Sequence, residues 1–262
     1  MKQLISILFL FFFSLEIYSK DVVYIDETKE KSKKIALVIL NGIGDSKKNR
    51  KVQLNFFKEK GMDVYIPNYK QRSSLDESLY KFSVFFDDYE IEKYDEVYFM
   101  CYIIGGYVLN RYIELYGKKN IKKIIYDRSP TQERAARIGV DKLPFFTRLK
   151  YGQLVFDFSE VKLKSLENKF DIKVGVIIEN QATRLMRFFE KSSYKYGEYS
   201  FDVQQIEKNY DDYFHTWLDH DLMYRRFDVI GKEILFFFKN GMFTENAKRT
   251  KYDFDPFKKI RL

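Results

Sequence analysis

The stretch Tyr98-Phe99-Met100-Cys101-Tyr102-Ile103-Ile104-Gly105-Gly106 changes its pattern halfway along. Its first half belongs to a run from Glu96 to Cys101 that predicts a buried strand. From Gly106 to Tyr116 the apolar spacing predicts a helix that stops at Gly117. Because the two adjacent glycines carry no side chain, the start of this helix can lie close against the strand. The stretch therefore predicts a strand that turns directly into a helix.

Strands and helices alternate on both sides of this stretch. A continuous apolar run such as Ile35 to Leu40 suits a strand that is covered on both faces. The order favours parallel strands joined by right-handed crossovers, which predicts an α/β fold with a doubly wound, mostly parallel sheet. Further strands are expected at Val22 to Ile25, Asp63 to Ile66, Ile121 to Tyr126 and Lys173 to Ile178. Further helices are expected at Val52 to Lys60, from the capping residues Ser73 and Ser74 to about Phe86, at Thr183 to Phe189 and at Asp228 to Lys239.

In open α/β sheets, ligands gather at the carboxyl ends of the strands, where the Tyr98 to Gly106 turn also lies. This turn resembles the strand–nucleophile–helix elbow of the G-x-S-x-G type in the α/β-hydrolases. When Gly105 is matched to the closing glycine of that motif, Ile103 takes the position of the catalytic serine and Cys101 that of the opening glycine. The resemblance implies a sheet of α/β-hydrolase type in which the nucleophile has been replaced.

A second loop supports the resemblance. Leu40-Asn41-Gly42-Ile43-Gly44-Asp45 follows a buried strand and is similar to the glycine-containing oxyanion loop of the same family. Glycines in such a loop let backbone N–H groups approach a developing negative charge. The resemblance implies that Asn41, Gly42 and Ile104 occupy the oxyanion-loop positions.

Two later segments extend the similarity to small bacterial lipase- and esterase-like hydrolases. Asp127 to Ala136, followed by Leu143-Pro144-Phe145-Phe146 and Gly152, is similar to a segment after their sixth strand. His220-Asp221-Leu222-Met223, a helix, and then Asn240-Gly241-Met242-Phe243 resemble their histidine loop, final helix and terminal glycine motif. The similarity spans about residues 34 to 243.

The family also needs a histidine base and a carboxylate that orients it. His220 matches better by its spacing to the last helix, and His215 is the rival, because His215-Thr216 is a common start of that loop. Either histidine can be an inherited position without a present catalytic role. Glu179 follows the expected strand without forming a convincing acid motif. Asp127 is the weak acid candidate, and Asp202, Asp211 and Asp212 are others.

The elbow residue has a physical consequence of its own. In active relatives this residue sits in a strained backbone conformation that a β-branched side chain resists, at a cost of about 1–3 kcal/mol. We therefore expect either a relaxed turn at Ile103 or apolar packing that fills the former active site. Cys101 lies two residues before the elbow position, and a buried structural role is expected for it.

Residues 1 to 19 differ from the rest of the chain. Met1 and Lys2 give a positive start, and Leu4 to Leu15 form an apolar run too short to span a bilayer comfortably. This pattern predicts a signal peptide with Ser19 at a plausible cleavage point, and hence an exported protein, periplasmic or secreted; an uncleaved anchor is the alternative. Residues 20–243 are expected to form one hydrolase-like domain.

Charge is spread along most of the chain. The formal net charge is +8, and basic residues alternate with acidic ones, which favours a solvated surface. Residues 244–262 form a basic tail that is expected to fray, with contact to an anionic membrane surface as the alternative. An exported chain without a recognisable motif argues against nucleic-acid binding.

Two functions remain open from the sequence. The first is a non-catalytic α/β-hydrolase homologue, a pseudoenzyme, that binds a small acyl or lipid-like ligand or a protein partner. The second is an active carboxylic ester hydrolase, an esterase or lipase, whose nucleophile lies elsewhere, with Ser129 as a candidate. Neither hypothesis includes a metal or another cofactor.

Overall fold

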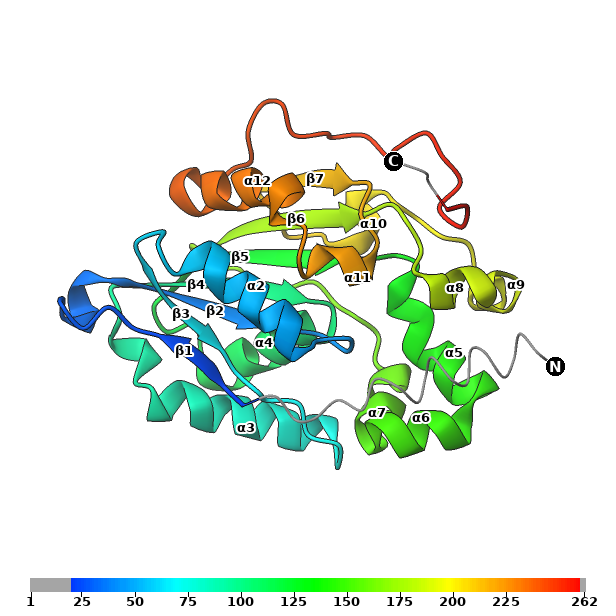
Figure 1. The fold of residues 1–262 in the computed structure, drawn as a ribbon, viewed down its shortest axis with the longest axis horizontal. Coiled ribbons are helices and arrows are strands. Elements are labelled where there is room, and N and C mark those ends of the chain that lie inside the picture. The colour runs from blue at the N-terminus through cyan, green and yellow to red at the C-terminus, as the bar shows by residue number, and fades with distance from the viewer. Residues whose placement is uncertain (1–19, 260–262) are drawn as a thin grey trace.

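The computed structural model describes residues 20–259, so the predicted signal peptide at residues 1–19 lies outside the described part (Figure 1). A seven-stranded sheet runs through its centre in the order β1-β3-β2-β4-β5-β6-β7. Strand β1 pairs antiparallel with β3, and every other neighbouring pair is parallel. The strands are β1 (Val22–Tyr24), β2 (Ile35–Leu40), β3 (Met62–Ile66), β4 (Glu96–Tyr102), β5 (Ile121–Arg128), β6 (Lys173–Glu179) and β7 (Asp212–Thr216). The predicted doubly wound, mostly parallel sheet is confirmed.

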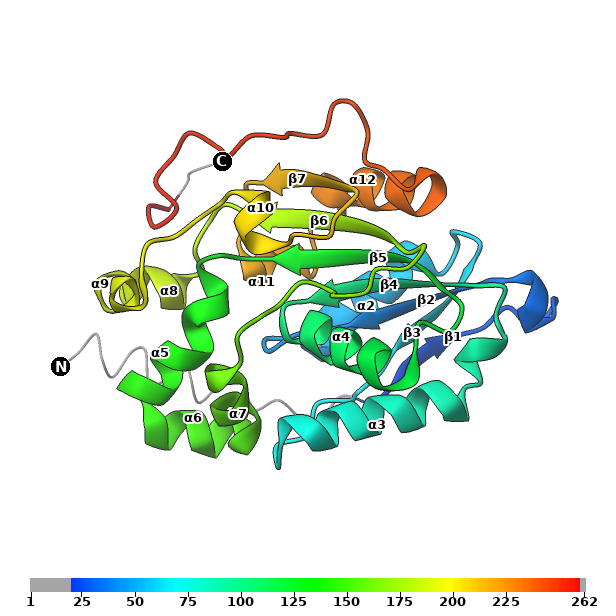
Figure 2. The ribbon, with the colours of Figure 1, turned by 180° about the vertical axis from the view of Figure 1, so that it is seen from behind.

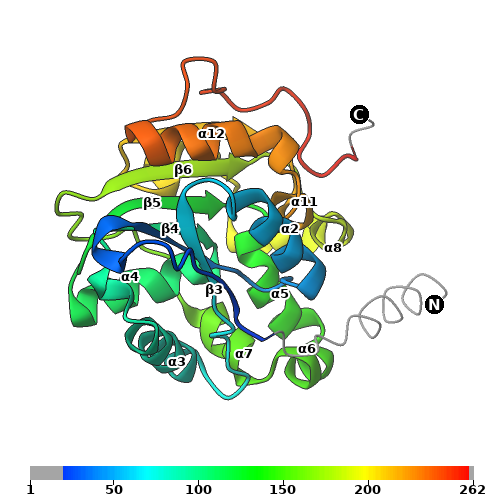
Figure 3. The same cartoon turned by 60° about the vertical axis from the view of Figure 1, so that its left-hand side comes forward.

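Helices cover both faces of the sheet (Figures 1 and 2). Helices α2 (Lys47–Phe57) and α12 (Phe227–Asn240) lie on one face, and α3 (Leu75–Asp88) and α4 (Ile104–Tyr116) on the other (Figure 3). Strand β2 contributes side chains to the cores on both faces, because successive residues of a strand point in opposite directions. Its unbroken apolar run follows from this double burial.

Capping side chains set several helix boundaries. Helix α2 begins at Lys47, five residues before the predicted start, because the Ser46 side chain accepts a hydrogen bond from the backbone N–H of Asn49. Ser74 caps α3 in the same way, as predicted. Helix α12 ends at Gly241, which has a left-handed conformation with φ of 75°.

A group of helices that the strand and helix pattern did not predict lies on the side toward which the parallel strands point (Figure 1). It consists of α5 (Ala135–Lys142), α6 (Pro144–Tyr151), α7 (Gln153–Glu160) and, after β6, α9 (Glu190–Ser193). Helix α8 (Arg184–Phe188), directly before α9, confirms the helix expected at Thr183 to Phe189. Short 3₁₀ helices are formed by Lys31–Lys33, Ile91–Lys93, Gln132–Arg134 and Tyr194–Tyr196. Within residues 20–259, no helix is long and apolar enough to cross a membrane.

The basic C-terminal segment packs on the sheet as far as it is described, so the expected frayed end is wrong for this part. The backbone N–H of His215 in the edge strand β7 donates to the carbonyl of Lys248 at 2.7 Å. The backbone N–H of Ala182 donates to the carbonyl of Pro256 at 2.9 Å. These bonds satisfy polar groups that an edge strand and its loops otherwise expose.

Candidate functional site

The turn between β4 and α4 keeps an unusual backbone. Ile103 has φ of 29° and ψ of −86°, although a positive φ is unfavourable for a β-branched residue. Its carbonyl accepts the backbone N–H of Gly106 at 3.0 Å, and its own N–H donates to the carbonyl of Asp127 at 3.3 Å. A Cβ atom on Gly105 would lie 2.2 Å from the carbonyl oxygen of Leu40, so only glycine fits there. The relaxed turn is therefore absent, and Ile103 is instead buried in the apolar core.

His220 opens the short helix α11 (His220–Met223) and faces two carboxylates at the ends of neighbouring strands. Its Nδ1 lies 2.7 Å from Oε1 of Glu179 and 3.5 Å from Oδ2 of Asp127. Asp127 on β5 is paired in register with Ile177 on β6, so Asp127 and Glu179 point to the same face of the sheet. All three side chains are buried. The structure thus brings together His220 and Asp127 and adds Glu179 as the closer acid.

Burial and charge together set the protonation of this cluster. Burial raises the pKa of the Glu179 carboxyl well above its ordinary value, and the neighbouring carboxylate of Asp127 raises it further. Burial alone would lower the pKa of His220, but the charges of Glu179 and Asp127 outweigh it and hold this pKa well above its ordinary value. The two acids therefore stabilise the charged form of the imidazole, while burial opposes charge on His220 and on Glu179.

The other nitrogen of His220 is closed off by a tyrosine. The Tyr224 hydroxyl lies 3.1 Å from His220 Nε2, the atom that faces the nucleophile in a hydrolase triad. The Tyr224 ring stacks on Tyr102 with 4.3 Å between ring centroids. A Cβ atom on Gly42 would lie 2.9 Å from the Tyr224 hydroxyl oxygen. Tyr224 therefore fills the space between the oxyanion loop and the histidine.

The predicted oxyanion loop is held by its own contacts. The side chains of Asn41 and Gln53 exchange two hydrogen bonds, of 2.9 and 2.8 Å. The Tyr69 hydroxyl donates to the carbonyl of Asn41 at 2.7 Å, and Lys70 Nζ donates to the carbonyl of Gly42 at 2.6 Å. The loop carbonyls are thereby bound from within the chain. Ile104, the remaining oxyanion-loop candidate, is the buried first residue of α4.

The two alternative nucleophiles, Cys101 and Ser129, are both buried. Cys101 faces the sheet side opposite to Tyr102 and the histidine, and burial raises the pKa of its thiol well above the ordinary value. The Ser129 hydroxyl is buried, and among residues 20–259 its hydrogen bonds stay within its own turn, with Gln132 N (3.3 Å) and Thr131 Oγ1 (3.4 Å). These positions give neither group a base to activate it.

The remaining acid candidates are engaged away from His220. Asp202 caps the helix α10 (Val203–Ile206), where its side chain accepts the backbone N–H of Gln204. Asp211 pairs with Lys169 and Lys173, and Asp212 pairs with Arg249. None of these three carboxylates belongs to the histidine cluster.

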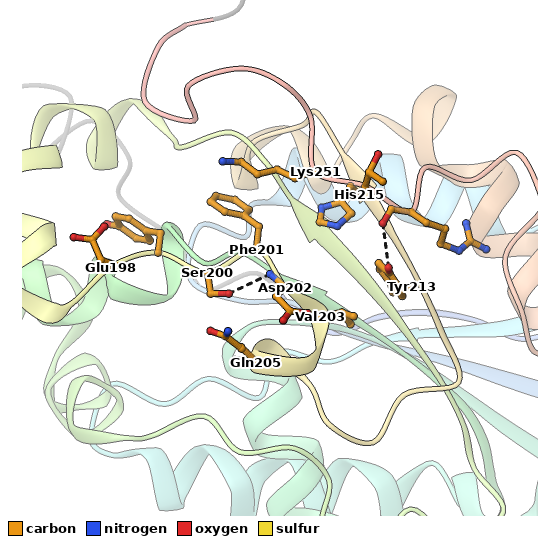
Figure 4. A pocket seen from close by; sticks show the side chains of 12 residues that line it. Glu198, Ser200, Phe201, Asp202, Val203, Gln205, Tyr213, His215 and Lys251 are labelled. Carbon is orange, nitrogen blue, oxygen red and sulfur yellow. Dashed lines mark hydrogen bonds between the residues drawn. The ribbon is translucent and has the colours of Figure 1, made fainter.

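The rival histidine, His215, lines a separate groove with a volume of about 680 Å³ (Figure 4). The groove lies between the segment from Glu198 to Gln205, strand β7 and residues Arg249 to Lys251. His215 Nδ1 lies 2.9 Å from the Asn180 side-chain nitrogen, so an amide takes the place of an acid. Burial, with a contribution from Lys248 and Lys251, lowers the pKa of His215 to about 4.

Two residues of the central cluster were not identified from the sequence. Glu179 stands directly at the end of a strand, in the place expected for the acid, but the sequence offers no convincing aspartate there. Tyr224 follows His220 by four residues, and this spacing places the two side chains on one face of a helical turn. Both signals were present, but they depend on knowing which side chains face inward.

The sequence matches no protein-family model and no curated protein. Solved structures, in contrast, match the fold over most of the chain. A lipase from Bacillus licheniformis superposes with a TM-score of 0.55 at 12% identity, over 84% of this chain and 97% of that one. A bromoperoxidase from Bacillus anthracis gives 0.54 at 14% identity, over 79% and 92%. Est1E from Butyrivibrio proteoclasticus gives 0.53 at 12% identity, over 85% and 99%.

These likenesses show that the chain has the α/β-hydrolase fold. Identities of 12–14% carry no information about the reaction. What the chain does must be argued from its own residues, above all Ile103 and the group around His220.

Proposed function

We propose that this protein is an exported, non-catalytic homologue of lipases and esterases that binds a ligand or a partner. The observation that carries this proposal is the hydrocarbon side chain of Ile103 at the strained turn where a nucleophile would stand. Acyl transfer of the hydrolase type needs a nucleophilic oxygen or sulfur atom at the elbow position, beside the base. Here the base nitrogen meets the Tyr224 hydroxyl instead.

The burial of the residues around His220 also supports a non-catalytic function. His220, Glu179 and Tyr224 are each at most 3% exposed, so a substrate carbonyl has no way to reach the histidine in this conformation. Tyr224 is itself a poor nucleophile there, because burial raises the pKa of its hydroxyl well above the ordinary value. The side chains that have the arrangement of a hydrolase triad are therefore packed inside the protein.

Activity assays test this proposal directly. The purified mature chain is treated with short p-nitrophenyl esters and with a fluorophosphonate probe, and His220→Ala serves as the control. We expect neither turnover nor labelling. Labelling of the wild-type protein, or turnover that disappears in His220→Ala, would establish the alternative of an active serine-type acyl hydrolase, with Ser129 as the first serine to examine.

A gain-of-function variant makes the negative result informative. Ile103→Ser alone places a hydroxyl at the elbow while Tyr224 still occupies the base, so we expect it to stay unlabelled. The double variant Ile103→Ser/Tyr224→Ala frees His220 Nε2, and we expect slow labelling by the fluorophosphonate. If the double variant folds but does not react, the interpretation of His220 as a correctly placed base is wrong.

The groove at β7 is the better place for a ligand. Its volume of about 680 Å³ lies within the range of small-molecule sites. Aromatic side chains of Tyr199, Phe201 and Tyr213 line it, and Lys251 Nζ lies 4.6 Å from the centroid of the Phe201 ring. Lys251 forms no ion pair within residues 20–259. An apolar body with an anionic head, as in a small acyl or lipid-like acid, fits this lining.

Binding of a fluorescent fatty acid tests this part of the proposal. We expect saturable binding that Lys251→Ala weakens about tenfold, because the anionic head of the ligand loses the ammonium group that pairs with it. Lys232→Ala, on an exposed position of α12, is the matched control and should bind as the wild type does. Equal affinity of all three proteins would contradict a role for the groove.

Export rests on residues 1–19 and has its own test. The intact mass of the protein recovered from the cell envelope or the medium should correspond to a chain that begins near Lys20. Leu10→Lys interrupts the apolar run and should retain the full-length chain in the cytoplasm. Recovery of both proteins in the cytoplasm would refute the proposed export.

A further inference from the structure

Three buried side chains converge on one point at the carboxyl ends of β5 and β6. One ligand-type atom from each of Asp127, Glu179 and His220 lies within 4.8 Å of the other two. His220 Nδ1 is 2.7 Å from Glu179 Oε1 and 3.5 Å from Asp127 Oδ2. Each residue comes from a different element, so no motif of fixed sequence spacing identifies this cluster.

Three of the four carboxylate oxygens in this cluster have no hydrogen-bond partner within the described residues. Both oxygens of Asp127 and the Oε2 atom of Glu179 are buried without a hydrogen bond among residues 20–259. Buried carboxylate oxygens without a donor are strongly unfavourable. A single proton shared between the two acids would pair one oxygen of each and leave the other Asp127 oxygen alone. A cation held by one ligand atom from each of the three residues would supply a partner to both carboxylates and to the imidazole at once.

We propose that Asp127, Glu179 and His220 bind one divalent transition-metal ion, with Zn²⁺ as the best fit. The charge of two carboxylates balances that of the ion, and one imidazole nitrogen with two carboxylates is a ligand set that zinc accepts. Ligand atoms around tetrahedral zinc lie about 3.3 Å apart, as follows from metal–ligand distances of about 2.0–2.2 Å. The observed distances of 2.7 and 3.5 Å lie on either side of this value.

Binding changes the histidine in a defined way. Nδ1 must give its lone pair to the metal, so the neutral imidazole carries its proton on Nε2. That N–H then donates to the Tyr224 oxygen, which already lies 3.1 Å away. Such an outer hydrogen bond orients a metal-bound histidine. Tyr224 therefore acts as a positioning residue for the proposed site.

The test uses protein isolated without an affinity tag from cells that express the full-length sequence. Elemental analysis after equilibration with ZnCl₂ and gel filtration should give about one equivalent of zinc. Thermal unfolding should shift upward by on the order of 5–10 °C when zinc is a hundredfold above its Kd, and EDTA should reverse the shift. Less than a tenth of an equivalent of zinc, with no change in Tm, would overturn the proposal.

Variants locate the ion. Asp127→Asn and His220→Asn should each abolish both the stoichiometric zinc and the Tm shift. His215→Asn removes the other histidine of the chain, which is not part of the cluster, and should behave as the wild type does. Zinc retained by both cluster variants, or lost equally in His215→Asn, would disprove the assignment.

The visible absorption of Co²⁺ bound to the wild-type protein tests the site even if the cluster variants do not fold. Co²⁺ should produce visible absorption bands typical of a four-coordinate site, and Zn²⁺ should displace them. Tyr224→Phe keeps every ligand but removes the outer hydrogen bond, so it should keep the stoichiometry while weakening affinity about tenfold. The absence of cobalt bands in folded wild-type protein would contradict the site.

Discussion

The two histidines of the chain lie five residues apart in the sequence and in opposite surroundings. His220 is enclosed with two carboxylates and a tyrosine hydroxyl, and these acids raise its pKa. His215 lines a groove beside Lys248 and Lys251, and burial together with these cations lowers its pKa to about 4. In the part of the chain that the structure describes, the neighbourhood of His220 has hydrolase geometry but lies outside the groove, whereas His215 is equally buried but lines the groove and has no acid partner.

This difference shows that catalytic geometry and access for a substrate are separate requirements. A base and its orienting acid are catalytic only if a substrate can reach them, and the packing of Tyr224 against Tyr102 prevents this near His220. The groove around His215 can accept a ligand, but an Asn180 amide stands where an acid would be needed. The enclosed histidine and the groove at β7 therefore support the proposal of binding rather than turnover.

The largest expected effect concerns the packing of the turn between β4 and α4. Gly105→Ala should lower the free energy of unfolding by more than about 3 kcal/mol, because its Cβ would lie 2.2 Å from the backbone oxygen of Leu40. Gly197→Ala, in the loop that leads to the groove, meets nothing within 4 Å and carries only the cost of its φ of 100°, about 1–3 kcal/mol. Urea denaturation of both variants measures the difference. Equal losses would show that the elbow turn is not rigidly packed.

The second effect is the pH dependence that the groove histidine introduces. The pKa of His215 is about 4 in the folded protein, below its ordinary value of 6.5, so the unfolded chain binds more protons between these values. Stability should therefore fall as the pH drops from about 6.5 to about 4, by on the order of 2–3 kcal/mol from this residue. The slope of unfolding free energy against pH should be shallower in His215→Asn. An unchanged slope would mean that His215 is as well solvated when folded as when unfolded.

The smallest effect compares two tyrosine hydroxyls. Tyr224→Phe leaves His220 Nε2 without its partner and should cost about 1–2 kcal/mol. Tyr213→Phe removes a hydroxyl that donates to the carbonyl of Arg249 at the partly buried edge of the groove, and should cost less than about 1 kcal/mol. Chemical denaturation ranks the two variants. A reversed order would indicate that the enclosed cluster is looser than its distances suggest.

Much of the fold followed from the sequence because its signals are local. The apolar run Ile35 to Leu40 and the stop at Gly117 predicted β2 and the end of α4 at the observed residues. Helix α2 started earlier than its apolar spacing indicated, since the Ser46 cap extends it through a polar first turn. Strand β7 was missed because Asp212–Thr216 is short and polar, and its pairing with β6 and Lys248 is what makes it a strand.

By itself, the sequence determined the alternation of elements, the sheet class and the absence of a nucleophilic side chain at Ile103, because each depends on residue type and spacing. Only the tertiary structure decided that Glu179 lies closer than Asp127 to His220, and that the Tyr224 hydroxyl occupies the space beside His220 Nε2. These contacts join residues 41 to 93 positions apart, or depend on the direction in which a helical turn faces. The residue pattern along the chain does not show that these side chains lie close together. The register of β5 with β6 does, because it brings Asp127 and Glu179 to the same place.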